Sequence, residues 1–383
     1  MALSEPAFRH IHTGVRADIG DNRLREQESY VRVEASGVMQ DEPERLIGLD
    51  LVRACEAAAL NALGWIGKGD KDAADAAATD AIRGMLNLID MCGTCTIGEG
   101  IKDQAPGIFV GEKLGTWKNE APTVSIALDP IDGTTLTAKG LPGAISVMAA
   151  ASTPCADENA LAAVPSYYMD KIAFGPKVKE GEGTIRFDAP IEQNLEVIAL
   201  KLGKRVRDLV VCLLDRPRHA DRIAAIRRTG AAIRLIGDGD VAGAIAPSMP
   251  DSGVDVFLGI GGSPEAVLAA AAIKCLGGEI YARMWPRDEK ELGELRTDHG
   301  MTDDDFQRIY TSEEMARGDG IVFAATGITD SAMLRGVVVN GAIARTQSIV
   351  MRSRSRTVRY ITAYHDLRLK TIRLHSLAGE QRL

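Results

Sequence analysis

Between residues 209 and 276, short apolar segments rich in β-branched residues alternate with segments of helical periodicity. Strands are predicted at residues 209–214, 231–236 and 254–260, and helices at residues 219–229, near Val241 and at residues 264–276. Strands that alternate with helices pair in a mainly parallel sheet, and ligands bind at the carboxyl ends of such strands. The sequence therefore predicts an α/β fold with functional residues at strand ends.

Polar motifs follow each of these three strands. They are DRPRH with Arg216, Pro217 and Arg218, DGD with Asp238, Gly239 and Asp240, and GIGGSPE with Gly262 and Glu265. Arginine binds phosphate through two parallel hydrogen bonds, aspartate accepts hydrogen bonds from sugar hydroxyls, and glutamate offers oxygen to a metal. Each motif alone is a weak signal, because DGD and GIGG are also common in ordinary turns.

An earlier apolar run, residues 123–128, predicts another strand, and the polar turn DPIDGTT follows it. Pro130 blocks further strand pairing and Gly133 tolerates a sharp turn, so Asp129 and Asp132 can face one point outside the sheet. Clustered carboxylates suit Mg²⁺ or Mn²⁺, and the amides of Gly133 and Thr134 suit a phosphate. An ordinary turn is the alternative, since Asp, Pro and Gly are common turn residues.

Two further acids, nearer the amino end of the chain, lie at the ends of predicted secondary-structure elements. Glu99 stands between two glycines at the end of a strand predicted at residues 93–98, and Asp75 lies in the first turn of a helix predicted at residues 73–89. Lys71 belongs to the preceding segment, GKGDKDAAD. A solvated, charged helix start is the alternative interpretation of that segment.

These motifs together resemble a known family. DPIDGT resembles the DP(I/L)(D/E)G(T/S) signature of the metal-dependent, lithium-sensitive sugar and inositol phosphatases. The ordered set GKGDK, GEG, DPIDGT, YYM, RPRH, DGD, GIGGSPE and ATGIT narrows the resemblance to the class II fructose-1,6-bisphosphatases, over roughly residues 48–377. Ile101 and Gln104 depart from the family, which has acids there. The resemblance implies a layered αβαβα fold.

The resemblance also implies a reaction, namely hydrolysis of the 1-phosphate of fructose 1,6-bisphosphate with Mn²⁺ or Mg²⁺ at two or more sites. Some relatives also cleave sedoheptulose 1,7-bisphosphate. The implied metal ligands are Asp75, Glu99, Asp129, Asp132 and Glu265. The implied substrate contacts are Asp132, Gly133, Thr134, Tyr168, Arg216, Pro217, Arg218, Asp238, Gly239, Asp240 and Gly262. For catalysis, we expect Thr134 to orient the attacking water, Asp103 to act as a base and Lys71 to neutralise charge.

Composition and length bound the remaining expectations. With 383 residues, 26% of them charged, and a net charge of −8, the chain is long enough for two lobes and ill suited to nonspecific nucleic-acid binding. Six cysteines without a dense framework, and no apolar leader or membrane-length apolar run, predict a cytoplasmic protein. We expect an arm at residues 1–45, a metal-binding lobe at 46–190 with 341–383, and a substrate-binding lobe at 191–340. The charged segment from residue 284 to about residue 320 is expected to be loop-like. The resemblance implies a homodimer or homotetramer.

Two rival functions stay open at this point. One is an inositol or other sugar monophosphate phosphatase of the same superfamily. The other is a non-catalytic, anion-binding regulatory protein that kept the sheet.

Overall fold

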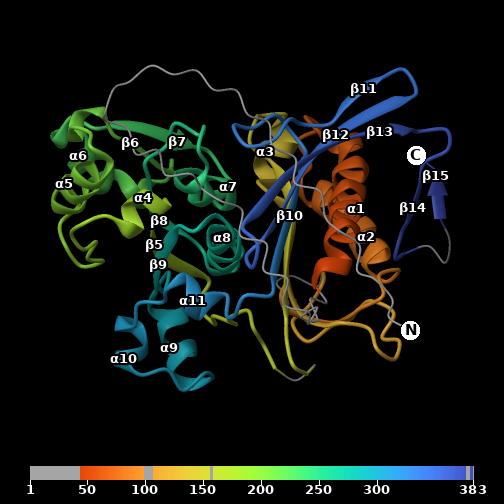
Figure 1. Ribbon diagram of the computed structural model, residues 1–383, viewed down its shortest axis with the longest axis horizontal. Helices are drawn as coiled ribbons and strands as arrows, with labels where there is room; N and C mark the ends of the chain where they lie inside the picture. Colours follow the sequence, from red (N-terminus) through yellow and green to blue (C-terminus); the bar gives the residue numbers. More distant parts are fainter. Residues whose placement is uncertain (1–43, 99–106, 156–157, 377–379, 383) are drawn as a thin grey trace, which may run out of the picture. The chain divides into compact units, whose positions relative to one another are not determined.

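The computed structural model describes residues 44–98, 107–155, 158–376 and 380–382. Residues 41–383 form one compact unit built on two sheets (Figure 1). The predicted arm lies outside the described residues except for Glu44 and Arg45, which begin the first helix. Glu99 and Asp103 also lie outside them. No helix in the described part of the chain is long and apolar enough to cross a membrane.

The larger sheet joins strands from both halves of the chain. Its strand order is β11-β12-β10-β4-β3-β1-β2, and β13 pairs with the other edge of β12. The strands are β1 (Cys92–Ile97), β2 (Lys113–Leu114), β3 (Thr123–Asp132), β4 (Ile145–Ser152), β10 (Ile321–Gly327), β11 (Val338–Asn340), β12 (Ile343–Arg352) and β13 (Thr357–Asp366). Among these strands, only β1 and β3 pair in parallel. A separate pair, β14 (Thr371–Arg373) and β15 (Glu380–Arg382), lies near the carboxyl end.

The smaller sheet has the order β7-β6-β8-β5-β9. Its strands are β5 (Tyr168–Phe174), β6 (Val210–Leu214), β7 (Ala232–Ile236), β8 (Val256–Gly262) and β9 (Glu279–Met284). The predicted parallel pairing of β6, β7 and β8 is confirmed. β5 pairs antiparallel with both β8 and β9, so one strand of opposite direction is inserted in the sheet.

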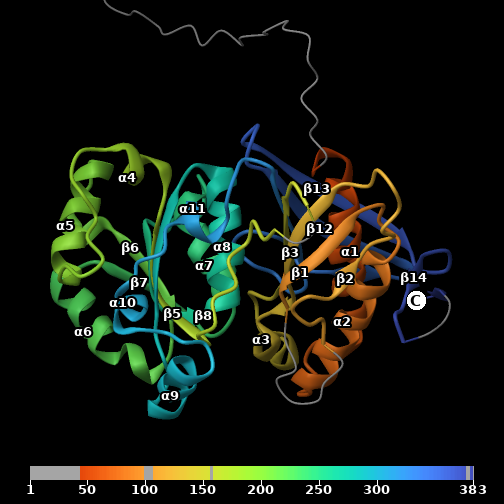
Figure 2. The same cartoon turned by 90° about the horizontal axis from the view of Figure 1, so that it is seen from below.

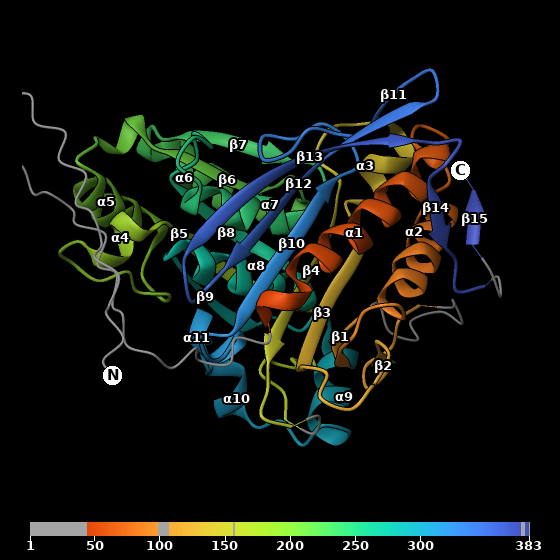
Figure 3. The same cartoon turned by 45° about the vertical axis from the view of Figure 1, so that its right-hand side comes forward.

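Helices cover the faces of both sheets. The main ones are α1 (Glu44–Ala62), α2 (Lys71–Leu86), α5 (Ile191–Leu202), α6 (Ala220–Thr229), α7 (Asp240–Ile245) and α8 (Ser263–Leu276). The apolar sides of α1 and α2 pack on the larger sheet, and Figure 3 shows α1 lying along β10, β4 and β3. Helices α7 and α8 lie between the sheets (Figure 2). Helices α5 and α6 cover the other face of the smaller sheet. The order of layers is therefore helix, sheet, helix, sheet, helix.

Short helices complete the unit, and three of them lie in a segment that the sequence analysis expected to be a loop. They are α3 (Thr134–Lys139), α4 (Pro176–Glu180), α9 (Glu289–Thr297), α10 (Asp303–Gln307), α11 (Ser312–Met315) and the 3-10 turns Leu63–Trp65, Val206–Asp208, Pro217–His219 and Ala246–Ser248. Residues 284–320 were expected to be loop-like, which was wrong. Side-chain caps start the helices there: Asp288 caps α9, and capping boxes begin α10 and α11.

Sheet membership also differs from the expected lobe boundaries. β5 was placed in the metal-binding lobe but pairs within the smaller sheet, and β10 was placed in the substrate-binding lobe but pairs within the larger one. The functional division into two lobes stays a prediction.

Helix α8 is the packing element shared by both sheets. It contacts β3, β4 and β10 on one side and β5, β8 and β9 on the other. Its central residues are four alanines, 269–272, all with no exposed surface. Small side chains are needed here because both faces of the helix meet a sheet.

We expect Ala270→Leu to lower the free energy of unfolding by about 1–3 kcal/mol, because the added methylenes must displace packed neighbours. Thermal and urea denaturation measure this loss. Ala224→Leu, on the exposed side of α6, is the matched control and should shift stability by less than about 0.5 kcal/mol. Equal stability of the two variants would contradict this account of α8.

Candidate active site

The predicted strand end at Leu128 was wrong, because β3 continues to Asp132. Opposite β4, the pairing register shifts between Asp129 and Asp132, so Pro130 lies in a β-bulge. The Asp129 carboxylate accepts a hydrogen bond of 2.9 Å from the amide of Ile131. Gly133 then takes the left-handed conformation (φ 99°) and begins α3. The bulge, rather than a strand break, brings both aspartates to the end of the strand.

Most of the predicted site residues line one cavity of about 320 Å³. From the larger sheet come Asp129, Asp132, Gly133 and Thr134. From the smaller sheet and its loops come Tyr168, Arg216, Arg218, Asp238, Gly239, Asp240, Gly262 and Glu265. Residues separated by more than 100 positions in sequence therefore meet at the carboxyl ends of β3, β6, β7 and β8.

Three predicted residues in the described part of the chain do not line this cavity. Lys71 is the exposed first residue of α2, and Pro217 begins a 3-10 turn. Asp75 is half-buried and lies beyond the predicted first turn, because α2 begins at Lys71 and not at residue 73. The loop before α2 is hydrogen-bonded to α3, since Gly67 N donates to the Thr137 carbonyl at 2.9 Å. The amino end of α2 is thereby held beside α3, and the roles of Lys71 and Asp75 remain proposals.

Asp132 is a buried acid whose pKa is strongly raised. It is 2% exposed, and its Oδ2 accepts a 3.2 Å hydrogen bond from Val241 N. Burial raises the pKa of Asp132 well above its ordinary value, and the nearby carboxylates of Asp240, Glu265 and Asp238 raise it further. A positive charge at this point would relieve the repulsion.

These acids fit a divalent cation by their chemistry, since carboxylate oxygens are the ligands of Mg²⁺ and Mn²⁺. Asp129, Asp132 and Glu265 line the same cavity. Within residues 44–98, 107–155 and 158–376, no three acidic, histidine or cysteine side chains are grouped closely enough to form a metal site by themselves. The predicted ligand Glu99 lies outside these ranges.

Glycines allow the acids to approach the end of β8. A Cβ atom added to Gly261 would overlap the carboxylate of Asp240, and one added to Gly262 would overlap that of Glu265. The GIGG motif thus has a steric function in this structure, because any side chain would displace a carboxylate of the cavity.

Arg216 and Asp238 bind each other. Arg216 Nη2 donates to Asp238 Oδ1 at 2.9 Å, and Nη1 donates to the Gly237 carbonyl. Asp238 Oδ2 accepts a 3.1 Å hydrogen bond from Thr135 N in α3. This network connects the loop after β7 to the helix that follows β3, so both side chains position the cavity wall.

Asp240 has a buried partner that the sequence analysis missed. Lys171 Nζ lies 2.6 Å from Asp240 Oδ2, and the two side chains are 1% and 4% exposed. In β5, Lys171 occupies the same face as the buried Met169 and Ala173. A lysine at a core-facing strand position was the signal for a buried ion pair, because a buried charge requires a partner.

His219, also missed, connects two strand ends. Its Nδ1 donates to the Leu214 carbonyl at 2.7 Å, and its Nε2 accepts from Ile260 N at 2.8 Å, which fixes a neutral ring. Leu214 ends β6, and Ile260 precedes the glycines of β8. His219 thereby holds the segment carrying Arg216 and Arg218 against β8.

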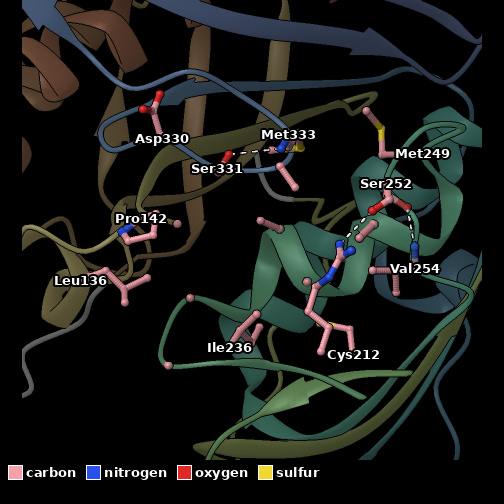
Figure 4. A pocket seen from close by; sticks show the side chains of 18 of the residues that line it. Leu136, Pro142, Cys212, Ile236, Met249, Ser252, Val254, Asp330, Ser331 and Met333 are labelled. Atoms are coloured by element: carbon pink, nitrogen blue, oxygen red, sulfur yellow. Dashed lines mark hydrogen bonds between the residues drawn. The ribbon is translucent and has the colours of Figure 1, made fainter. Parts of the chain in front are cut away.

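A second, larger cavity of about 500 Å³ lies behind the loop 237–239, which lines both cavities. Figure 4 shows its wall, formed largely by apolar side chains such as Leu136, Ile236 and Met333. A phosphorylated substrate requires charged partners, so the smaller, charged cavity is the candidate active site.

Comparison with known proteins agrees with this chemistry. Residues 45–365 match the family described as bacterial fructose-1,6-bisphosphatase, glpX-encoded. The chain is 44% identical over 333 residues to the class 2 fructose-1,6-bisphosphatase of Haemophilus influenzae, covering 84% of this chain and 97% of that protein. It is 39% identical to fructose-1,6-bisphosphatase 1 class 2 of Escherichia coli, covering 84% and 96%. It is 38% identical to the D-fructose 1,6-bisphosphatase class 2/sedoheptulose 1,7-bisphosphatase of a Synechococcus strain, covering 83% and 95%.

His219 should make stability depend on pH. Burial lowers its pKa below the ordinary 6.5, so the native state disfavours the protonated ring. Its contribution is therefore complete above pH 6.5 and is lost as the pH falls from 6.5 towards the lower native pKa. His219→Phe should be less stable than the wild type at pH 8. Between pH 7 and pH 5, its thermal unfolding midpoint should decrease less than the wild-type midpoint does. Thermal denaturation across that range measures both effects.

His375→Phe is the control, because His375 is exposed and its side chain makes no recorded hydrogen bond with the described residues. If the thermal midpoint of His219→Phe depends on pH in the same way as that of the wild type, the role given to His219 is contradicted.

Proposed function

Because this chain belongs to the glpX-encoded family of bacterial fructose-1,6-bisphosphatases, it is a phosphatase, and we propose the reaction and residue roles that follow. The substrate is fructose 1,6-bisphosphate, and hydrolysis of its 1-phosphate yields fructose 6-phosphate and phosphate. The observation that carries this proposal is the single cavity lined by Asp129, Asp132 and Glu265 together with Arg218. Acids that suit a cation and an arginine that suits a phosphate fit a sugar with two phosphates.

The metal would be Mn²⁺ or Mg²⁺ at two or more sites, held by Asp75, Glu99, Asp129, Asp132 and Glu265. When bound, it would supply positive charge that stabilises the phosphoryl group in transfer. Support comes from Asp132, whose pKa is raised by burial and further by the carboxylates of Asp240, Glu265 and Asp238.

The chain's own residues would position substrate and water. Thr134, the first residue of α3, orients the attacking water through its hydroxyl, while Asp103 acts as a base and Lys71 neutralises charge. Tyr168, whose ring lies beneath the Arg218 guanidinium, contacts the sugar phosphate. Asp238, Gly239, Asp240 and Gly262 form the sugar-facing wall. Arg216 and Pro217 fix the shape of that wall, since Arg216 already binds Asp238.

Dual specificity is part of the proposal. The name of the Synechococcus relative includes both bisphosphatase activities, and the alignment covers 95% of that protein and 83% of this chain. Sedoheptulose 1,7-bisphosphate is therefore the second substrate to test.

We also infer a cytoplasmic homodimer or homotetramer. All six cysteines are free, which supports a reducing compartment. β13 pairs with β12 alone among the described strands, and Tyr360 and Tyr364 on it are exposed. An unpaired edge strand that exposes aromatic side chains is typical of a protein contact surface.

Metal-dependent phosphate release tests the function directly. Purified protein with Mn²⁺ or Mg²⁺ should release phosphate from fructose 1,6-bisphosphate, and chelation should abolish the release. Asp129→Asn should reduce turnover to below about 1% of wild type, because it removes a charged oxygen from the cation. A folded, metal-loaded wild-type protein with no release would favour the anion-binding rival. Equal rates on inositol monophosphate would favour the monophosphatase.

The Thr134 hydroxyl has its own test. Thr134→Val keeps the size of the side chain but cannot orient water, so kcat should fall about 100-fold with little change in KM. Thr134→Ser, which keeps the hydroxyl, should retain most activity. Steady-state kinetics on fructose 1,6-bisphosphate measure both variants, and a normal kcat in Thr134→Val removes the residue from the mechanism.

A further inference from the structure

The segment after β9, for which sequence analysis predicted no functional residue, contributes Arg287 to the active-site cavity. We propose that Arg287 binds the substrate phosphate that is not cleaved, together with Arg218. This inference rests on the proposed bisphosphatase function and adds a residue that fixes the choice of a bisphosphate over a monophosphate.

Arg287 is held in place while most of its donors stay available. Its Nε donates to Glu291 Oε2 at 2.9 Å, and its guanidinium carbon lies 3.7 Å from the centroid of the Tyr167 ring. The structure assigns no acceptor in the described part of the chain to either Nη atom. The side chain is 43% exposed. A guanidinium fixed at Nε and on an aromatic face presents its outer nitrogens to a ligand without losing further rotamer freedom.

Glu291 is the support for this arrangement. Its side chain is 2% exposed, its Oε1 accepts a 2.8 Å hydrogen bond from Tyr167 N, and its Oε2 also accepts one of 2.9 Å from Arg287 N. One buried carboxylate therefore fixes both Arg287 and the aromatic ring beneath it. A buried acid with several charge-assisted hydrogen bonds is a strong constraint on geometry.

The other cavity arginines have fewer free donors. Both terminal nitrogens of Arg216 donate to protein oxygens, namely those of Asp238, Gly237 and Asp215. Arg218 donates from Nε and Nη2 to the Ile260 carbonyl, which leaves the two hydrogens of Nη1 and one of Nη2. A phosphate accepts several hydrogen bonds, so the outer nitrogens of Arg287 add to the donors of Arg218.

The placement favours the phosphate away from the metal acids. Tyr167 stacks with Arg287 and its neighbour Tyr168 with Arg218, so consecutive residues support both guanidinium groups. Arg287 forms its ion pair with Glu291 and none with Asp129, Asp132 or Glu265. An arginine beside the cation ligands would pair with them or repel the cation. Arg287 therefore suits the non-reacting end of the substrate.

The test compares substrates with and without the second phosphate. In Arg287→Met, KM for fructose 1,6-bisphosphate should rise about 10- to 100-fold, while kcat/KM for fructose 1-phosphate should change less than about 3-fold. The inhibition constant of fructose 6-phosphate, which carries the retained phosphate, should rise by the same factor as KM. Arg287→Lys keeps the charge but loses the two parallel N–H donors of the guanidinium group. Its KM and inhibition constant should therefore lie between those of the wild type and Arg287→Met.

Arg283→Met is the matched control, because Arg283 pairs with Asp188 and lies outside this cavity. It should leave both substrates unchanged. An unchanged inhibition constant for fructose 6-phosphate in folded Arg287→Met, or equal losses on both substrates, overturns the inference. A wild-type protein that releases no phosphate from fructose 1,6-bisphosphate overturns the proposed function instead, so the two failures are distinguishable.

Discussion

The end of β3 is held against the second sheet by two hydrogen bonds, and the active-site cavity depends on them. Asp132 accepts from the backbone of Val241 in α7, and Asp238 accepts from the backbone of Thr135 in α3. Each bond joins a carboxylate of one sheet's terminus to an amide of the other's. Both acids therefore have a structural role, because each forms a hydrogen bond that helps to position these strand ends relative to each other.

Two acids of this cavity form ion pairs with basic side chains, and three others are the proposed cation ligands. Lys171 neutralises Asp240, and Arg216 neutralises Asp238, both through side chains of the smaller sheet. The predicted cation ligands Asp129, Asp132 and Glu265 line the same cavity. Carboxylates close to Asp132 raise its pKa in addition to the effect of burial, so a cation at this end would lower the repulsion among them.

The sequence predicted those features that depend on local pattern. Strands β6 to β8 and the polar residues at their ends follow from apolar periodicity and turn chemistry, and the structure brings most of them into one cavity. The bulge at Pro130 was not predictable, because a proline in a strand usually indicates its end. The Lys171 pair, the His219 bridge and the Glu291 support each depend on partners at least 41 positions away. The core-facing position of Lys171 indicates a buried ion pair, but no local pattern identifies these distant partners.

Burial of Asp132 also determines how a cation and a proton compete. Because its pKa is raised, Asp132 keeps its proton to a higher pH than an ordinary aspartate does, which lowers the repulsion from the neighbouring carboxylates. A cation held by Asp132 would bind the charged carboxylate, so its binding would compete with the proton that burial helps to retain. The affinity for such a cation would then increase with pH. The same desolvation that disfavours the free carboxylate would strengthen its attraction to the cation, because the local dielectric constant is low.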